Sequence, residues 1–396
     1  MSLNSTPSGE RLHIGIFGKR NAGKSSVINA ITGQDLAIVS HVKGTTTDPV
    51  LKAMELLPLG PVMIIDTPGL DDSGDLGELR INKAYQILNK TDIAILVVDA
   101  TVGITKADNE ILEKIKSKEI PYIVVMNKMD LLPHVPKDYG DNYIFVSSVD
   151  STNIFQLKEL IAKQAVADKH KFPIIKDLLK PDDTVILVIP IDKSAPKGRL
   201  ILPQQQTIRE ILDANATALM VKENGLVKAL LNLKAKPALV VTDSQIFETV
   251  AKTVPKDIPL TSFSILFARH KGDLFTLAAG AKTLDNLKDG DKVLISEGCT
   301  HHRQCEDIGT VKLPKWVNDY TGKKLIYKYT GGVEFPLDLT PYKIIIHCGG
   351  CTLNEREMQY RIECAGDSNV PITNYGIAIS YMRGILERSL KVFSEI

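Results

Sequence analysis

Short apolar runs alternate with amphipathic stretches along most of this 396-residue chain. In its first part the apolar runs lie at residues 12–17, 62–65, 93–99 and 122–126, and each has the length of a buried strand. Turn residues or helical patterns separate them. Such alternation is typical of parallel sheets covered by helices, so the pattern predicts an α/β fold.

A basic stretch of mixed character at residues 166–180 interrupts the pattern, and we interpret it as a linker. Beyond it the alternation resumes, with strands predicted at 184–189, 218–221, 238–242 and 261–266 and helices at 204–215, 225–233 and 245–251. These elements would form a small, mostly parallel sheet. A sheet of few strands leaves an edge that needs covering, so we expect a homodimer through this domain.

The last part of the chain begins with a predicted helix at residues 273–287, and strand-like runs follow at 292–296 and 342–346. The first of these runs leads into Cys299-Thr300-His301, and the second ends at residues 347–351, HCGGC. If the two strands are parallel neighbours, both groups emerge at one edge of one sheet. Asn354 is placed to cap a helix that follows them.

Composition and charge narrow the class of protein. The chain is 44% hydrophobic with a net charge of +1, so it can build several cores and lacks a basic footprint for nucleic acid or anionic lipid. No apolar run approaches the length of a membrane span, and the N-terminus has no signal-peptide core. We therefore expect a cytoplasmic protein without membrane or nucleic-acid partners, with α/β domains at residues 1–172, 173–268 and 269–396.

Residues 18–25, GKRNAGKS, follow the first predicted strand and match the P-loop pattern. Backbone N–H groups of such a loop wrap phosphates, Lys24 reaches the β- and γ-phosphate oxygens, and the Ser25 hydroxyl can bind Mg²⁺. The residues of this loop that we assign to nucleotide binding are Asn21, Ala22, Gly23, Lys24, Ser25 and Ser26.

Further motifs of guanine nucleotide-binding proteins follow in the expected order. Thr46 offers a hydroxyl to Mg²⁺ and the γ-phosphate, Asp66 can hold the metal through water, and the Gly69 N–H can sense the γ-phosphate. The later motifs, which resemble the base-reading loops of GTPases, are Asn127-Lys128-Met129-Asp130 and Ser147-Ser148. The Asp130 carboxylate would accept hydrogen bonds from guanine N1 and N2. The motifs together predict GTP binding, with Lys24, Thr46, Asp66 and Gly69 serving hydrolysis.

Position 70 distinguishes this domain from Ras-like proteins, because it holds a leucine in place of a water-orienting glutamine. The domain resembles the translation-factor-related class of GTPases, which includes enzymes of tRNA modification and ribosome assembly. Relatives with this change often use a K⁺ ion held partly by a P-loop asparagine, and Asn21 occupies the matching position. Asn21 is equally well explained as a turn residue.

The cysteines and histidines of the last domain indicate a metal site. All five cysteines lie at or after Cys299, which argues against a disulfide scaffold. The candidate ligands are Cys299, His301, His347, Cys348 and Cys351. Thiolates with one or two imidazoles suit either zinc or an iron-sulfur cluster, and the spacing alone does not choose between them.

The order of a GTPase domain, a small middle domain and then C-x-H followed by HCxxC resembles the HydF family of [FeFe]-hydrogenase maturation GTPases. The resemblance implies a [4Fe-4S] cluster on Cys299, Cys348 and Cys351 with an exchangeable fourth position. It also implies a scaffold and carrier that receives a transient diiron precursor made with the radical-SAM maturases HydE and HydG. The carrier would deliver this precursor to the apo-hydrogenase HydA.

Two questions stay open from the sequence. The fourth iron ligand is His301, His347, Glu334, Asp338 or an exogenous group. The alternative function, from another class, is a GTPase of RNA modification or ribosome assembly whose last domain is a zinc-stabilised auxiliary module.

Overall fold

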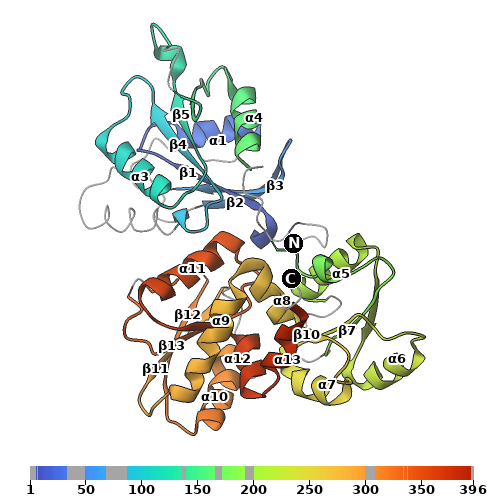
Figure 1. Ribbon diagram of the computed structural model, residues 1–396. Helices are drawn as coiled ribbons and strands as arrows, with labels where there is room; N and C mark the ends of the chain where they lie inside the picture. The colour runs from blue at the N-terminus through green and yellow to red at the C-terminus, as the bar shows by residue number, and fades with distance from the viewer. Residues whose placement is uncertain are drawn as a thin grey trace. The chain divides into compact units, whose positions relative to one another are not determined.

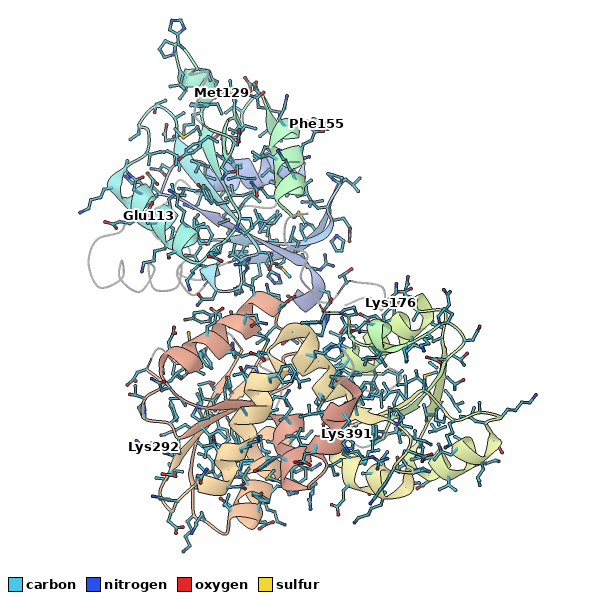
Figure 2. All side chains as sticks on the ribbon, in the orientation of Figure 1. Glu113, Met129, Phe155, Lys176, Lys292 and Lys391 are labelled. Atoms are coloured by element: carbon cyan, nitrogen blue, oxygen red, sulfur yellow. The ribbon has the colours of Figure 1, made fainter. Side chains whose placement is uncertain are left out.

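The computed structural model describes residues 6, 8–33, 50–67, 87–135, 140–165, 172–191, 200–298, 308–332, 334–336 and 338–393. The chain divides into two compact units, residues 1–170 and residues 171–396 (Figure 1). Side chains fill the space between sheets and helices inside each unit (Figure 2). Among the helices in the described ranges, none is both long and apolar enough to span a lipid bilayer.

The first unit is a six-stranded sheet in the order β2-β3-β1-β4-β5-β6. Its strands are β1 (Leu12–Phe17), β2 (Val50–Leu56), β3 (Gly60–Asp66), β4 (Ile93–Asp99), β5 (Tyr122–Asn127) and β6 (Tyr143–Phe145). Strand β2 pairs antiparallel with β3, and the other pairs are parallel. The predicted strands of this part of the chain are thus confirmed.

Helices cover both faces of this sheet. Helices α1 (Lys24–Thr32) and α4 (Ile154–Ala165) pack on one face, where Val27 and Leu157 join the core. Helix α3 (Lys106–Ser117) packs on the other face through residues such as Ile111. Because β1, β4 and β5 are buried on both sides, they are apolar almost throughout, as the sequence pattern indicated.

The second unit holds two four-stranded sheets in which every pair of neighbours is parallel. The first has the order β10-β9-β7-β8, with β7 (Thr184–Val188), β8 (Thr217–Val221), β9 (Leu239–Thr242) and β10 (Leu260–Ser262). Its helices are α5 (Leu202–Asp213), α6 (Leu226–Asn232), α7 (Phe247–Thr253) and α8 (Phe263–Lys271). The predicted small parallel sheet is confirmed.

The predicted strand at 261–266 is wrong in its second half. Strand β10 ends at Ser262, and α8 begins at Phe263. The Ser262 hydroxyl accepts a hydrogen bond from the Ile265 N–H at 3.3 Å and so caps the helix. A short apolar run fits a buried strand and a buried helix equally well, which explains the error. The predicted boundary at residues 268 and 269 falls inside this helix.

The second sheet of this unit has the order β12-β11-β13-β14. Its strands are β11 (Lys292–Glu297), β12 (Ile326–Gly331), β13 (Ile344–His347) and β14 (Ile372–Asn374). The helices are α9 (Leu274–Ala281), α10 (Leu313–Thr321), α11 (Glu355–Asp367), α12 (Tyr375–Met382) and α13 (Leu386–Leu390). One hydrophobic cluster runs from Val240 of the first sheet to Ile345 of the second, so the two sheets share a core.

The parallel arrangement predicted for the two ligand-bearing strands is confirmed. Strand β13 lies beside β11, with His347 opposite Ser296 in the register. Both strands therefore end at the same edge of the sheet. The predicted cap of α11 is also confirmed, because the Asn354 side chain accepts from the Glu357 N–H at 3.1 Å.

Candidate functional site

The predicted nucleotide loop connects β1 to α1. Asn21 and Gly23 both have positive φ, at 60° and 91°. A Cβ added at Gly23 would lie 2.1 Å from the side-chain nitrogen of Asn127, so only glycine fits there. This close approach brings the loop against the end of β5, which carries the predicted base-reading motif.

Asn127 joins two of the predicted nucleotide loops. Its buried side chain donates to the Ala22 carbonyl at 3.1 Å and accepts from the Ser148 N–H at 3.3 Å. Ser147 is fully buried beside it, whereas the carboxylate-bearing Asp130 is exposed. The structure therefore brings together the P-loop and both predicted base-reading motifs.

Lys128 is fixed next to this junction by an ion pair. Its Nζ lies 2.5 Å from Asp99 Oδ2 at the end of β4. Partial burial acts to raise the pKa of Asp99, but the hydrogen bonds from Lys128 and Thr101 outweigh it and hold the pKa below its ordinary value. The sequence motif predicts a role for Lys128, whereas no local pattern indicates its partner Asp99.

Lys24, Ser25 and Asp66, which are predicted to serve phosphate and Mg²⁺ binding, lie close together. The Lys24 ammonium donates to the carbonyls of Gly18 and Lys19, each at 2.9 Å. Burial raises the pKa of Asp66, while the charges of Lys24 and Lys52 and a hydrogen bond from Ser25 oppose this shift. Helix α1, which begins at Lys24, carries Ser25 and Ser26 in its first turn. Thr46 and Gly69 lie outside the described residues.

The second candidate site is the loop that follows β13, which we call the cysteine loop (residues 348–353). Its start is tied to β11, because the Cys348 N–H donates to the Ser296 carbonyl at 2.8 Å. Gly350 has φ 62°, and a Cβ there would lie 2.7 Å from the Met358 sulfur. Glycine thus lets the chain turn back toward Cys351.

Two backbone N–H groups point at the sulfur of Cys348. They belong to Gly298 at 3.0 Å and Gly350 at 3.4 Å. The Thr352 hydroxyl also donates to the Gly298 carbonyl at 2.9 Å. Gly298 is the last described residue before Cys299, and these contacts tie it to the cysteine loop. Cys299 and His301 themselves lie outside the described residues.

Two buried cations flank the cysteine loop. Lys271, at the end of α8, is 1% exposed and donates to the Leu353 carbonyl at 3.0 Å. Burial raises the pKa of the Cys351 thiol, and the charge of Lys271 together with N–H groups of the loop opposes that shift. Arg361 of α11 is fully buried on the other side.

His347 does not fit the predicted role of a metal ligand in this arrangement. Its Nε2 lies 2.9 Å from Arg361 Nη1, and its Nδ1 lies 2.7 Å from the Cys348 carbonyl oxygen. Burial, followed by the charge of Arg361, lowers the pKa of His347 to about 3. Both ring nitrogens are therefore used within the protein, and the imidazole is neutral.

The two oxygen candidates for the fourth position differ in their surroundings. The Asp338 carboxylate accepts hydrogen bonds from the Thr340 N–H and hydroxyl at 3.0 and 2.6 Å, which lower its pKa. Glu334 is exposed in the loop after β12. Within the described ranges, no three His, Cys, Asp or Glu side chains lie close enough to hold a metal ion. The described ranges do not include Cys299 or His301.

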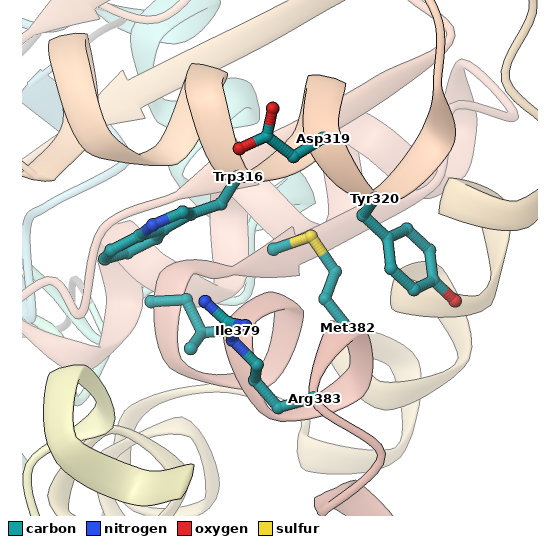
Figure 3. A pocket seen from close by; sticks show the side chains of 6 residues that line it. All are labelled: Trp316, Asp319, Tyr320, Ile379, Met382 and Arg383. Atoms are coloured by element: carbon teal, nitrogen blue, oxygen red, sulfur yellow. The ribbon is translucent and has the colours of Figure 1, made fainter.

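A pocket of about 200 Å³ lies between α10 and α12. Its lining residues are Trp316, Asp319, Tyr320, Ile379, Met382 and Arg383 (Figure 3). It contains none of the predicted site residues.

Three protein families match different parts of the chain. The model described as "Hydrogen maturase F tetramerization domain" matches residues 275–392, and "Hydrogen maturase F dimerization domain" matches residues 174–272. The model described as "50S ribosome-binding GTPase" matches residues 13–128. The tetramerization model matches the part of the second unit that holds the second sheet, and the dimerization model matches the part that holds the first sheet. The GTPase model matches residues of the first unit.

Among curated proteins the chain is similar to tRNA modification GTPases named MnmE. The enzyme of Nitrosomonas eutropha is 33% identical over 158 residues, which is 39% of this chain and 35% of that protein. The enzyme of Aquifex aeolicus is 34% identical over 162 residues, which is 40% of this chain and 36% of that protein. The chain thus spans about a third of the length of these relatives.

Among solved structures the chain is similar to Era from Aquifex aeolicus bound to GDP and AlF₄⁻. The identity is 22% and the TM-score 0.36, over 53% of this chain and 92% of that one. A probable GTP-binding protein engB is 23% identical, with a TM-score of 0.33 over 39% of this chain and 99% of that one.

The two maturase models together match more than half of the chain, and the GTPase model matches the part that carries the P-loop. On this evidence the chain belongs to the hydrogen maturase F family.

Proposed function

We propose that this protein is a GTP-hydrolysing scaffold and carrier that assembles and delivers the diiron precursor of [FeFe]-hydrogenase. Residues 1–172 bind and hydrolyse GTP, residues 173–268 form a homodimer, and residues 269–396 hold a [4Fe-4S] cluster. The diiron cargo comes from the radical-SAM maturases HydE and HydG and passes to the apo-hydrogenase HydA. Membership of the maturase family supports the maturation role.

The observation that carries the cluster proposal is the 3.0 Å contact between the Gly298 N–H and the sulfur of Cys348. Cys299 follows Gly298 directly, and Cys351 lies in the same loop as Cys348. Cysteine thiolates with N–H groups directed at sulfur are the donors that iron-sulfur clusters use, so the chemistry of these residues fits the group. The buried charge of Lys271 adds to that fit, because it favours a negatively charged centre.

We assign three iron ligands to Cys299, Cys348 and Cys351 and leave the fourth position exchangeable. A carrier must bind its cargo and later release it, which a labile position allows. His301, Glu334 and an exogenous group are candidates for it. Asp338 is a further candidate, and its Oδ1 accepts two hydrogen bonds from Thr340.

Anaerobic purification tests the cluster proposal. We expect brown protein with iron and sulfide, both lost in Cys299→Ala, Cys348→Ala and Cys351→Ala. Cys364→Ala is the matched control and should keep both, because Cys364 packs against the hydrophobic core from α11. Colourless protein with stoichiometric zinc would overturn the proposal and favour an RNA-modification or ribosome-assembly GTPase with a zinc-stabilised domain.

In the first domain, a water attacks the γ-phosphorus of GTP, and the bond to the β-phosphate oxygen breaks to leave GDP and phosphate. Ser25 and Thr46 would hold Mg²⁺, with Asp66 acting through water, and the ion offsets charge on the phosphates. Lys24 and the Gly69 N–H would stabilise the γ-phosphate oxygens. We expect Lys24→Ala to abolish hydrolysis, measured as phosphate release.

Asn21 is our candidate ligand for K⁺ in this domain. Its left-handed backbone, with φ 60°, supports a tight loop around the phosphates but suits a plain turn residue as well. A comparison of GTP hydrolysis in potassium and sodium salts separates the two. Faster hydrolysis in K⁺ that is lost in Asn21→Ala supports the ligand role, and equal rates in both salts remove it.

The first sheet of the second unit offers a surface for the homodimer. Its edge strand β10 is buried and packs against α13. The other edge, β8, is partly exposed, and Met220 on it is 50% exposed. Val227 and Leu231 of the nearby α6 are 55% and 79% exposed. Pairing of β8 with its copy would cover this edge.

A further inference from the structure

Arg361 of α11 is fully buried, and each of its N–H groups has an acceptor. Nε and Nη2 donate to Glu357 Oε1 at 3.0 and 2.8 Å. Nη1 donates to the Ser296 hydroxyl at 3.2 Å and to His347 Nε2 at 2.9 Å, and Nη2 donates to the Gly332 carbonyl at 2.8 Å. A guanidinium has five N–H donors in a rigid plane, so its hydrogen-bonding capacity is fully used here.

These contacts reach three separate segments around the cysteine loop. Ser296 lies at the end of β11, two residues before Gly298. His347 ends β13 and precedes Cys348. Gly332 follows β12, and in the same loop the Phe335 ring lies 5.1 Å from the guanidinium carbon. A single side chain thus holds the ends of β11, β12 and β13 at the edge where the predicted ligands emerge.

The contact with Arg361 also determines the tautomer of His347. A guanidinium can only donate, so Nε2 must be the acceptor and the ring proton must lie on Nδ1. Nδ1–H then donates to the Cys348 carbonyl at 2.7 Å. Through this pair of hydrogen bonds, Arg361 reaches the backbone of Cys348.

We propose that Arg361 is the positioning residue of the cysteine loop and that it holds His347 as a hydrogen-bond donor to the Cys348 carbonyl rather than as an iron ligand. The inference rests on the cluster function proposed above. Burial of the Glu357–Arg361 pair supports it: a pair four residues apart on a helix usually lies in solvent, and burying it carries a desolvation cost. Here the pair organises the strand ends.

The first test measures alkylation of individual cysteines in full-length protein purified without iron. Arg361→Lys keeps the charge but loses the planar fork of donors. We expect alkylation of Cys348 to become about tenfold faster, because loss of one charge-assisted hydrogen bond makes local opening around the thiol easier by about that factor. Cys364, also on α11, is the internal reference. An unchanged rate at Cys348, or an equal increase at Cys364 from general loosening of the helix, overturns the proposal.

The matched control for this test is Arg388→Lys. Arg388 also donates to several backbone carbonyls, those of Ala251, Val254, Pro255 and Ile258, but far from the cysteine loop in the chain. We expect it to leave the alkylation rate of Cys348 unchanged. If it speeds alkylation as much as Arg361→Lys does, the effect is not specific to the site and the proposal is wrong.

The second test uses the iron-loaded protein and examines His347 directly. In His347→Asn the amide can still donate to the Cys348 carbonyl but is a poor iron ligand. We expect this variant to keep its iron within about twofold of wild type and to leave the nitrogen hyperfine couplings of the reduced cluster unchanged. If the wild-type cluster shows a strong nitrogen coupling that His347→Asn lacks, the imidazole is an iron ligand and the proposal is wrong. If the wild-type protein itself takes up no cluster, the proposed function fails, while the alkylation test still decides the role of Arg361.

Discussion

The buried ammonium group of Lys271 donates a hydrogen bond to the carbonyl oxygen of Leu353 over 3.0 Å. Lys271 ends α8, and Leu353 closes the cysteine loop two residues after Cys351. The same charge acts on the Cys351 sulfur, where it opposes the effect of burial on the thiol pKa. The contact therefore holds the loop in place and brings positive charge to the proposed cluster.

Replacing this charge should shift the redox properties of the cluster. We expect Lys271→Met to lower the midpoint potential of the bound cluster by about 60 mV, a tenfold change in a one-electron equilibrium, because the reduced state carries more negative charge. The measurement is a potentiometric titration followed by electron paramagnetic resonance. Lys282→Met, at an exposed position, is the control, and equal potentials in both variants would contradict the expectation.

The ion pair between Asp99 and Lys128 should matter for guanine nucleotide affinity. Asp99→Asn removes the charge that holds Lys128 in place, and we expect GDP binding to weaken about tenfold at neutral pH. Titration with a fluorescent GDP analogue measures it. Asp213→Asn breaks an exposed ion pair with Arg209 and should leave affinity unchanged. Wild-type affinity in Asp99→Asn would show that Lys128 needs no partner.

The same ion pair gives a pH dependence with a definite sign. Because the folded protein holds the pKa of Asp99 below its ordinary value, the pair stabilises the fold above the ordinary pKa. That stabilisation disappears as the pH falls through the folded pKa. The free energies of unfolding of wild type and Asp99→Asn, measured in urea, should therefore differ by about 1 kcal/mol at pH 7 and converge in acid. A difference that stays constant with pH would exclude the ion pair as its cause.

The side chain of Asn127 gives a sharper test of how the nucleotide loops are joined. In Asn127→Asp an oxygen replaces the amide nitrogen that donates to the Ala22 carbonyl, so two acceptors face each other in a buried position. We expect at least tenfold weaker nucleotide binding and a lower melting temperature, since an unsatisfied buried group costs about 1–3 kcal/mol. Asn109→Asp, on the exposed surface of α3, is the control. Equal melting temperatures would show that the junction is not stabilising.

The features that the sequence predicted are those with a local pattern. Apolar runs of strand length, followed by glycines and by ligand-type residues, indicated β11 and β13 and the edge where they end. The P-loop glycines and the Asn354 cap are equally local. Partners for these residues come from distant segments, so no local pattern indicates Asp99, the ion-pair partner of Lys128.

Arg361 and Lys271 had no usable signal in the sequence. Glu357 and Arg361 are four residues apart, a spacing typical of exposed ion pairs on helices. Lys271 follows Arg269 and His270, and such a basic run at a helix end is usually solvated. These cations are buried only because the helices that carry them, α8 and α11, pack against the strand ends. The same packing turns His347 toward Arg361, and that contact could not be foreseen from the spacing of the metal motif.

The exposed edge of β8 gives the last prediction. Met220→Lys places a charge on the strand that we expect to pair with its copy, and a charge at a sheet edge opposes strand pairing. Light scattering after size exclusion should show the mass of the assembly fall by about half, because a homodimer whose pairing edge is disrupted separates into single chains. Val149→Lys, at a site 85% exposed in the nucleotide-binding unit, should leave the mass unchanged. An assembly that survives Met220→Lys intact would place the dimer contact elsewhere in the matched segment, and the exposed face of α6, with Val227 and Leu231, would then be the next surface to test.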